Sequence, residues 1–286
     1  MKKIVYFIEF IAIRLFFILC KLLGYRISSN FGFYIGRTFG NIFRTKKSII
    51  QNIEKSKISI DTSKNKFAKN VLGNYGRILA EYPFLKDFRN NNLSKYISID
   101  GIDNLEKIKK KEKPVVFISG HFNNFELMAM IIEREGIDLF AVYRPLNNKF
   151  LNKIMEYLRK NYICKNQIKK GLKGVREALA FFKKGKSLAI MIDQRVTEGI
   201  SSKFFGNNAF TTTIPAQFVK KFNCNIQPVY IERINDVHFK IIFDKQLEFN
   251  NEQSIENITE RLNRWLEEKI MKNPEQWIWT HNRWKS

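Results

Sequence analysis

The chain has 286 residues, 44% of them hydrophobic, which is enough to build one large α/β domain or two small ones. Fifty basic against 27 acidic residues give a formal net charge of +23, so the favoured partners are anionic: nucleic acid, a membrane surface or an acidic protein. Cys20, Cys164 and Cys224 are far apart, which excludes a disulfide framework and a Cys-x-x-Cys metal site. With only three dispersed histidines, we predict no metal and no cofactor.

The amino terminus is strongly apolar. Residues 4–23 are mostly large apolar side chains, interrupted by Glu9, Arg14 and Lys21. Twenty residues can cross a bilayer, but a charge near its centre costs roughly 2.5–3.5 kcal/mol. On a helix, Lys3, Arg14 and Lys21 form a basic stripe, which also fits a helix lying in the membrane interface, and a buried core helix is the third alternative. Because no small-residue cleavage site follows, we predict an uncleaved membrane-anchor or interfacial helix rather than a signal peptide.

The rest of the chain is predicted to form one domain. After the anchor over residues 1–26, a helical lead-in covers 27–92 and an α/β core covers 93–286. Apolar runs bounded by turn residues predict strands over 96–100, 115–119, 138–143, 187–192, 226–231 and 237–243. Helical periodicity predicts helices over 125–135, 149–161, 172–184, 213–222 and 254–272, and the polar stretch 196–213 is predicted to be a long loop. The alternation predicts a mainly parallel sheet flanked by helices.

One strand of this sheet ends in a candidate catalytic group. The run 115–119 is followed by Gly120 and His121, and Glu126 lies five positions further on. Five residues apart on one helix point about 140° away from each other, but a histidine in the turn and a glutamate in the first helical turn can converge. A carboxylate that holds an imidazole makes it a better base toward a hydroxyl group, as acyl transfer to an alcohol needs. We therefore predict that His121 is a general base oriented by Glu126; a structural histidine ending a strand is the alternative.

Further polar groups follow other predicted strands. Arg144 follows the strand 138–143, and Asp193, Gln194 and Arg195 follow the strand 187–192. The carboxyl ends of parallel strands share one edge, where ligands gather, so we expect these groups to converge with His121. Guanidinium groups bind phosphate and other anions in bidentate fashion, although an arginine in such a place is often just a surface residue. Asp193 either contacts substrate or anchors its loop.

Several separate blocks carry a family resemblance. In chain order they are residues 74–77 with Glu81, 120–126, 143–148, 193–195 with 198–199, 204–206, 209 with 211, 215–216, and 274–279 with 283–285. Together they resemble the lipid A biosynthesis lauroyl/myristoyl acyltransferase family, one of the His-x4-Asp/Glu acyltransferases of the lysophospholipid-acyltransferase-like superfamily. Asn123 stands where the family often has glycine and Phe125 where it often has tryptophan. Asparagine tolerates left-handed backbone geometry, so the first change is compatible with the same turn.

The resemblance implies a function and a set of site residues. It implies transfer of a fatty acyl group from an acyl-carrier-protein or coenzyme A thioester to a hydroxyl of a phosphorylated lipid A precursor, in lipopolysaccharide biosynthesis. It also implies a glycerolipid-acyltransferase-like fold, attached to the bacterial inner membrane with the catalytic domain on the cytoplasmic side. The residues that it assigns to catalysis are His121 and Glu126, and those that it assigns to substrate binding are Arg144, Asp193, Gln194, Arg195 and Gly206.

Other interpretations stay open at this point. The acceptor is alternatively another glycolipid or a lysophospholipid. A non-enzymatic, basic membrane-surface or nucleic-acid-binding protein would explain the charge but not the strand-ending histidine, so nucleic acid is not an expected partner. Phe204 and Phe205 either contact an acyl chain or pack beneath their loop. Trp277, Trp279 and Trp284 either lie at a membrane interface or hold the carboxyl-terminal segment on the core.

Overall fold

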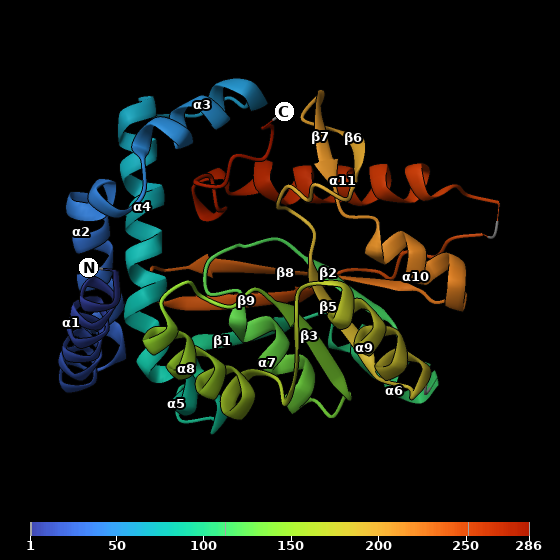
Figure 1. Ribbon diagram of the computed structural model, residues 1–286, viewed down its shortest axis with the longest axis horizontal. Coiled ribbons are helices and arrows are strands. Elements are labelled where there is room, and N and C mark those ends of the chain that lie inside the picture. The colour runs from blue at the N-terminus through green and yellow to red at the C-terminus, as the bar shows by residue number, and fades with distance from the viewer. Residues whose placement is uncertain (1, 112, 251, 286) are drawn as a thin grey trace.

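The computed structural model describes residues 2–111, 113–250 and 252–285 (Figure 1). The α-helices are α1 (Lys2–Leu23), α2 (Tyr25–Phe43), α3 (Lys46–Ser56), α4 (Lys64–Glu81), α5 (Leu85–Arg89), α6 (Ile102–Lys111), α7 (Glu126–Arg134), α8 (Lys149–Leu158), α9 (Leu172–Lys183), α10 (Ile214–Phe222) and α11 (Ile255–Lys272). The 3-10 turns are η1 (Tyr82–Phe84), η2 (Ser94–Tyr96) and η4 (Pro274–Gln276), and η3 (Arg159–Ile163) is a π-helix. The strands are β1 (Ile97–Asp100), β2 (Val116–Ser119), β3 (Leu139–Tyr143), β4 (Asn166–Lys169), β5 (Ser187–Met191), β6 (Ile200–Phe204), β7 (Asn207–Thr211), β8 (Ile226–Ile234) and β9 (His238–Phe243).

A seven-stranded sheet forms the core, in the order β1-β9-β8-β2-β5-β3-β4. All neighbouring pairs are parallel except β8 and β9, which are antiparallel. Every residue of β2 is buried, as expected for a strand between two neighbours with helices on both faces. In Figure 1, α11 runs along one side of the sheet, and α7, α8 and α9 lie on the other. The predicted mainly parallel sheet flanked by helices is therefore confirmed.

The predicted elements differ from the observed ones in four places. Strand β4 and helix α6 were not predicted, and the helix expected over 149–161 ends as α8 and continues as the π-helix η3. The prediction of a long loop over 196–213 is wrong, because β6 and β7 form an antiparallel hairpin in this stretch. Phe204 pairs with Asn207, so Phe205 and Gly206 make a two-residue turn, and both have positive φ, 50° and 70°. Such a turn matches the twist of a hairpin, but Phe-Gly is not a common sequence for it.

Residues 27–92 contain most of α2 together with α3, α4 and α5, and glycines explain how closely α2 and α4 pack. A Cβ atom added at Gly76 of α4 would lie 1.9 Å from the backbone oxygen of Gly32 in α2, and one at Gly36 would lie 2.3 Å from the backbone oxygen of Leu72. The two backbones are thus in direct contact, which no larger side chain allows. This packing fixes α4, which carries the buried Arg77 and Glu81, against α2.

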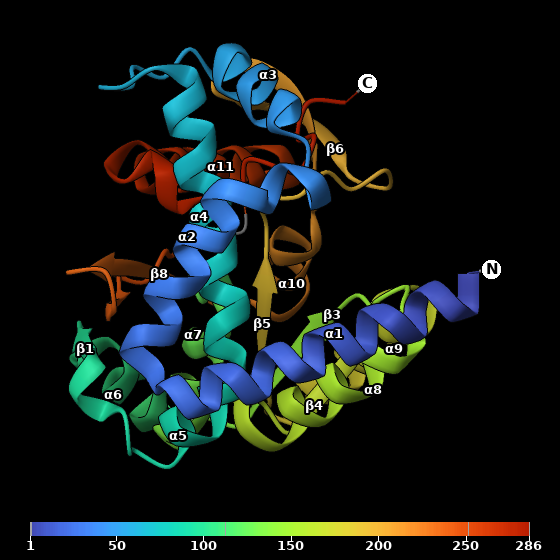
Figure 2. The same ribbon diagram turned by 90° about the vertical axis from the view of Figure 1, so that its left-hand side faces the viewer.

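Helix α1 lies on the surface of the domain, in front of α8 in Figure 2. Asn148 donates a hydrogen bond to Glu9 at 2.9 Å, and Lys21 pairs with Asp87, so two of the charges within the apolar run have partners. Cys20 is the buried side chain of α1, and the buried-core-helix alternative is therefore wrong. Among the described residues, no helix is both long and apolar enough to cross a membrane. The large apolar side chains that α1 exposes are Ile4, Val5, Phe7, Ile8, Ile11, Leu15, Ile18, Leu19 and Leu22.

Candidate functional site

The sheet brings His121 and Asp193 together. Strands β2 and β5 are neighbours in parallel register, and each is followed after one residue by the group in question. The Nδ1 atom of His121 lies 2.7 Å from Oδ1 of Asp193, and the His121 backbone N–H donates to Oδ2, also at 2.7 Å. The indole N–H of Trp277 donates to the same Oδ2 at 2.9 Å. Asp193 is fully buried, whereas the His121 side chain is 18% exposed and so reachable by a substrate.

The carboxylate of Asp193 decides which nitrogen of the neutral imidazole carries the proton. Burial raises the pKa of Asp193, but the charge of His121, its two hydrogen bonds and the one from Trp277 outweigh burial and lower the pKa overall. An ionised carboxylate only accepts hydrogen bonds, so Nδ1 of His121 is the donor between the two side chains. The neutral ring then has its lone pair on Nε2, which bonds to no other group in the described part of the chain. This is the tautomer of a general base.

Glu126 does not orient His121, so that prediction is wrong. Its Oε1 atom accepts hydrogen bonds from Arg159 Nε at 2.8 Å, from Arg159 Nη2 at 2.6 Å and from Tyr82 Oη at 2.8 Å. Burial lowers the pKa of Arg159, but the charges of Glu126 and Tyr82 and the hydrogen bonds to both together outweigh it and raise the pKa overall. Glu126 begins α7, and its side chain points toward the π-helix η3. The carboxylate that contacts Nδ1 of His121 belongs to Asp193, which follows the neighbouring strand β5. Asp193 therefore holds the position predicted for Glu126.

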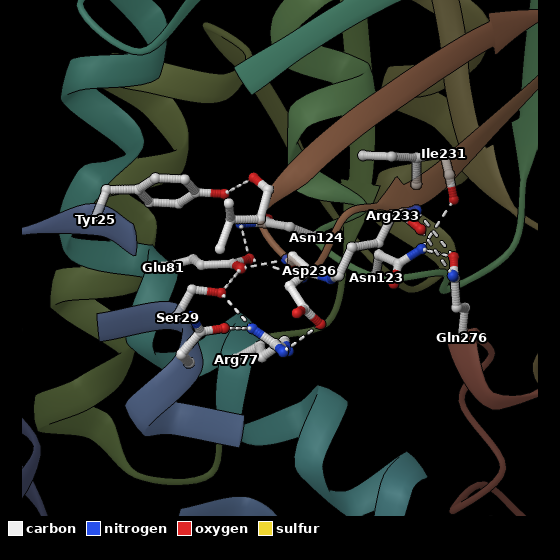
Figure 3. Close-up of polar contacts among 12 residues, drawn as sticks. Tyr25, Ser29, Arg77, Glu81, Asn123, Asn124, Ile231, Arg233, Asp236 and Gln276 are labelled. Atoms are coloured by element: carbon white, nitrogen blue, oxygen red, sulfur yellow. Dashed lines mark hydrogen bonds and ion pairs between the residues drawn. The ribbon is translucent and has the colours of Figure 1, made fainter. Parts of the chain in front are cut away.

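The loop after His121 is held by its two asparagines (Figure 3). Asn123 has φ 43°, so the asparagine here adopts the left-handed geometry with which it was expected to be compatible. Its amide donates to the backbone oxygen of Ile231 at 3.1 Å and to Gln276 Oε1 at 2.7 Å, and Asn124 donates to Glu81 Oε2 at 3.2 Å. Neither asparagine caps α7 through its side chain.

A buried charge network extends from this loop into α2 and α4 (Figure 3). Arg233 of β8 makes two bonds to Glu81, at 2.6 and 3.1 Å, and Ser29 of α2 donates to Glu81 at 2.7 Å. Arg77 pairs with Asp236 at 2.9 Å. Breaking such a pair leaves an uncompensated buried charge, so each member depends on the others. The segment that contains Arg77 and Glu81 therefore stabilises the loop after His121 and has no part in the reaction itself.

The carboxyl-terminal segment forms a wall of the site. Phe122 and Trp277 form an antiparallel β-bridge, and the backbone N–H of Asn123 donates to the Gln276 oxygen at 3.1 Å. Trp277, Trp279 and Trp284 are 2%, 0% and 6% exposed, so they hold this segment on the core, and the membrane-interface alternative is wrong. Phe204 is fully buried, with its ring centroid 5.6 Å from that of Trp284, so its role is packing.

The predicted substrate-binding residues are not all brought together. Strand β5 separates β3 from β2, so Arg144, which follows β3, lies one strand further from His121 than Asp193 does. It is exposed, and no group within the described ranges bonds to it. The guanidinium of Arg195 instead donates to the backbone oxygen of Lys285 at 2.8 Å, and its contacts do not support anion binding. Gly206 lies in the turn between β6 and β7, and Gln194 follows Asp193 on the partly exposed edge.

A second histidine near the site was given no role from the sequence. His281 accepts a hydrogen bond at Nε2 from the backbone N–H of Arg195, at 3.0 Å. Burial lowers the pKa of His281, and the charge of Asp193 only partly offsets this, so the ring is neutral near pH 7. Its backbone oxygen accepts from Asn52 at 2.9 Å. His281 therefore ties the loop after Asp193 to the carboxyl-terminal segment, a role that no local sequence pattern indicates.

A strand-ending imidazole with a buried carboxylate on Nδ1 is an arrangement that can take a proton from a substrate hydroxyl. The model of the bacterial lipid A biosynthesis acyltransferase family matches residues 1–286, so the chain belongs to this family and is an acyltransferase. It is 22% identical over 219 residues to the lipid A biosynthesis palmitoleoyltransferase of Escherichia coli K12, covering 74% of this chain and 69% of that protein. The lipid A biosynthesis acyltransferase of Shigella flexneri matches equally.

A solved structure is also similar, although more distantly. It is the 1-acyl-sn-glycerophosphate acyltransferase of Thermotoga maritima, at 11% identity and a TM-score of 0.42, covering 96% of this chain and 99% of that one.

Proposed function

We propose that the protein transfers a fatty acyl group from an acyl-carrier-protein or coenzyme A thioester to a hydroxyl of a phosphorylated lipid A precursor. His121 is the general base and Asp193 orients it. The observation that carries this proposal is the 2.7 Å contact between Asp193 and Nδ1 of His121, with Nε2 unused and the side chain partly exposed. The names of the Escherichia coli and Shigella relatives support lipid A biosynthesis as the setting.

The proposed reaction follows from the tautomer. Nε2 of His121 takes the proton of the acceptor hydroxyl while that oxygen attacks the thioester carbonyl carbon. The C–S bond then breaks, and the departing thiolate receives the proton back from Nε2, giving an ester and a free thiol. Asp193 stabilises the imidazolium that exists between the two steps, because its carboxylate is already desolvated and fixed by hydrogen bonds. No covalent acyl-enzyme is needed.

Arg144 is the proposed contact for an anionic group of the acceptor. It follows β3, two strand positions from β2, or about 10 Å at the usual strand spacing. A phosphorylated glycolipid headgroup is large enough to reach from there to His121. The net charge of +23 favours this acceptor, an acidic carrier protein and an anionic membrane alike. Gln194 remains a candidate for substrate binding, on its position beside Asp193 alone.

The proposed membrane contact is the outer face of α1 and α2 (Figure 2). Large exposed apolar side chains continue from α1 into α2, where Ile27, Phe39 and Ile42 are 59%, 54% and 75% exposed. Because α1 contacts the domain at Glu9 and at Lys21, we propose that it lies along the cytoplasmic surface of the bacterial inner membrane. Exposed basic residues of the helix then face anionic lipid.

The test of the chemistry is the substitution His121→Ala. The purified protein is given an acyl thioester and a lipid A precursor, and mass spectrometry follows the mass gained by the lipid. General-base removal should reduce the rate roughly 10²–10⁴-fold, with an unchanged far-ultraviolet circular dichroism spectrum. The matched control is His238→Gln, a histidine on β9 outside the site, which should retain activity. A near-parental rate for His121→Ala would refute the mechanism. If the parent protein acylates a lysophospholipid and not the lipid A precursor, the proposed acceptor is wrong.

A further inference from the structure

The carboxylate of Asp193 can perform its role only in one orientation. Its two oxygens have different partners: Oδ1 faces the His121 ring, and Oδ2 accepts both the His121 backbone N–H and the Trp277 indole N–H. Rotation about the last torsion of an aspartate is soft, since that torsion has a broad distribution. Donors on Oδ2 therefore decide whether Oδ1 stays on the imidazole.

We propose that Trp277 is a positioning residue of the acyl-transfer site, whose indole N–H fixes the Asp193 carboxylate against His121. This inference rests on the proposed function, in which His121 is the base. It makes the carboxyl-terminal segment a working part of the site as well as a structural cover. The tryptophan acts through Asp193, and nothing in its placement brings it to the substrate.

The indole of Trp277 is held in the orientation that this role requires. The backbone is fixed by the β-bridge to Phe122, the residue that directly follows His121. The ring lies between Trp279, at a centroid distance of 4.7 Å, and Phe204, at 6.0 Å. With 2% of the residue exposed, the indole has no room for another rotamer. The histidine, its carboxylate and the donor to that carboxylate are thus linked by direct contacts.

The three tryptophans of this segment differ in what their N–H groups bind. Trp279 donates to the backbone oxygen of Pro274 at 2.6 Å, and Trp284 donates to that of Phe204 at 3.1 Å. Trp277 donates to a buried carboxylate, and hydrogen bonds to charged acceptors are roughly twice as strong as those between neutral groups. Removing one N–H from each of the three is therefore the same chemical change with different expected consequences.

Loss of the Trp277 hydrogen bond should alter the reaction in two measurable ways. One of the two donors on Oδ2 is lost, so the carboxylate is held less firmly against Nδ1 and kcat should fall roughly tenfold, the scale of a lost bond to a charged group. A carboxylate turned partly away from Nδ1 also stabilises the charged imidazolium less. The pH at which kcat/KM reaches half of its maximum should therefore fall. KM should change little, because the indole does not touch the substrate.

The experiment compares Trp277→Phe with Trp279→Phe and Trp284→Phe in the full-length protein. All three lose one buried indole N–H, and all three should lower Tm. The expected result is that Trp277→Phe alone loses kcat and shifts the pH profile. A second variant replaces the indole of Trp277 by benzothiophene, which exchanges the N–H for sulfur and keeps the ring size, in case the phenylalanine variant folds poorly.

The outcomes separate this inference from the proposed function. If His121→Ala is inactive while Trp277→Phe and the benzothiophene variant keep the parental kcat and pH profile, the positioning role is refuted and the base survives. Equal losses of kcat in all three tryptophan variants, without a pH shift in any, would also refute it, since they would reflect packing. If His121→Ala is itself active, the proposed function fails first.

Discussion

The substitution Asp193→Asn is the sharpest test of the pair formed by His121 and Asp193. The exchange keeps size and shape, so the buried site should accept it. One asparagine oxygen can still accept the His121 backbone N–H and the Trp277 N–H, both of which bond to Oδ2 in the parent. The amide nitrogen then faces Nδ1 of His121 as a donor, where the parent has an acceptor at 2.7 Å.

The magnitude follows from the tautomer that this change imposes. With a donor opposite, Nδ1 must carry the lone pair and Nε2 the proton, so the atom facing the substrate can no longer accept one. The same aspartate-to-asparagine change in a Ser-His-Asp triad lowers kcat about 10⁴-fold, and we expect a loss of about 10³–10⁴-fold here. The loss should fall on kcat, because the site keeps its shape and binds substrate as before.

The assay measures acyl transfer by Asp193→Asn and Glu126→Gln side by side. Glu126→Gln leaves the buried Arg159 without its counter-charge, which should lower the free energy of unfolding by about 3 kcal/mol while the His121 tautomer stays intact. We therefore expect a less stable but active Glu126→Gln protein and a folded but nearly inactive Asp193→Asn protein. The reverse pattern, with Asp193→Asn active and a folded Glu126→Gln inactive, would refute the assignment and return the orienting role to Glu126.

The same variant should change how stability depends on pH. Folding lowers the pKa of Asp193: burial raises it, but His121 and Trp277 outweigh burial. The ionised carboxylate therefore stabilises the fold above the unfolded-state pKa of about 3.9, and this contribution is lost as pH falls through the lower folded-state pKa. The free energy of unfolding lost on Asp193→Asn should therefore shrink as the pH falls below about 4. A difference that does not change with acidification would mean that the carboxylate contributes no charge-dependent stability.

Two further predictions concern the substrate and the membrane. Arg144→Ala should reduce acyl transfer to a phosphorylated acceptor roughly tenfold or more while hydrolysis of the thioester by water falls much less, and Arg176→Ala, another exposed arginine, should affect neither; equal losses of transfer and hydrolysis would contradict an acceptor role. The double substitution Leu15→Glu with Ile18→Glu on the face of α1 should abolish cosedimentation with anionic vesicles, whereas Ile102→Glu on α6 should not, and unchanged cosedimentation would place the membrane contact elsewhere.

Local patterns predicted much of this fold from the sequence. The apolar run before Gly120 and the alternating helices and strands were recognisable, because burial on two faces or on one helical stripe leaves a period in the sequence. The order of strands in the sheet leaves no such trace. Placing β5 between β2 and β3 brings Asp193 to His121 and moves Arg144 one strand further away, and nothing within either strand encodes that choice.

The interactions made by the carboxyl-terminal segment were hidden for a related reason. Trp277 and His281 lie 84 and 88 positions after Asp193 in the chain, and their roles arise from a β-bridge and from hydrogen bonds across the fold. Tryptophans near a terminus look alike in sequence whether they face lipid or the core. Their burial decides between these alternatives, and only three-dimensional packing reveals it.

The five-residue spacing between His121 and Glu126 is better explained by a loop whose two ends are held separately than by a contact between the two side chains. The loop between them must hold the imidazole still at one end and start α7 at the other. Asp193 and Trp277 fix the first end, while Arg159 and Tyr82 fix the second through Glu126. The five-residue spacing then reflects the length of a strand-turn-helix connection with a charged anchor at each end. In this chain a histidine and a glutamate can therefore both be needed at that spacing although their side chains do not bond to each other.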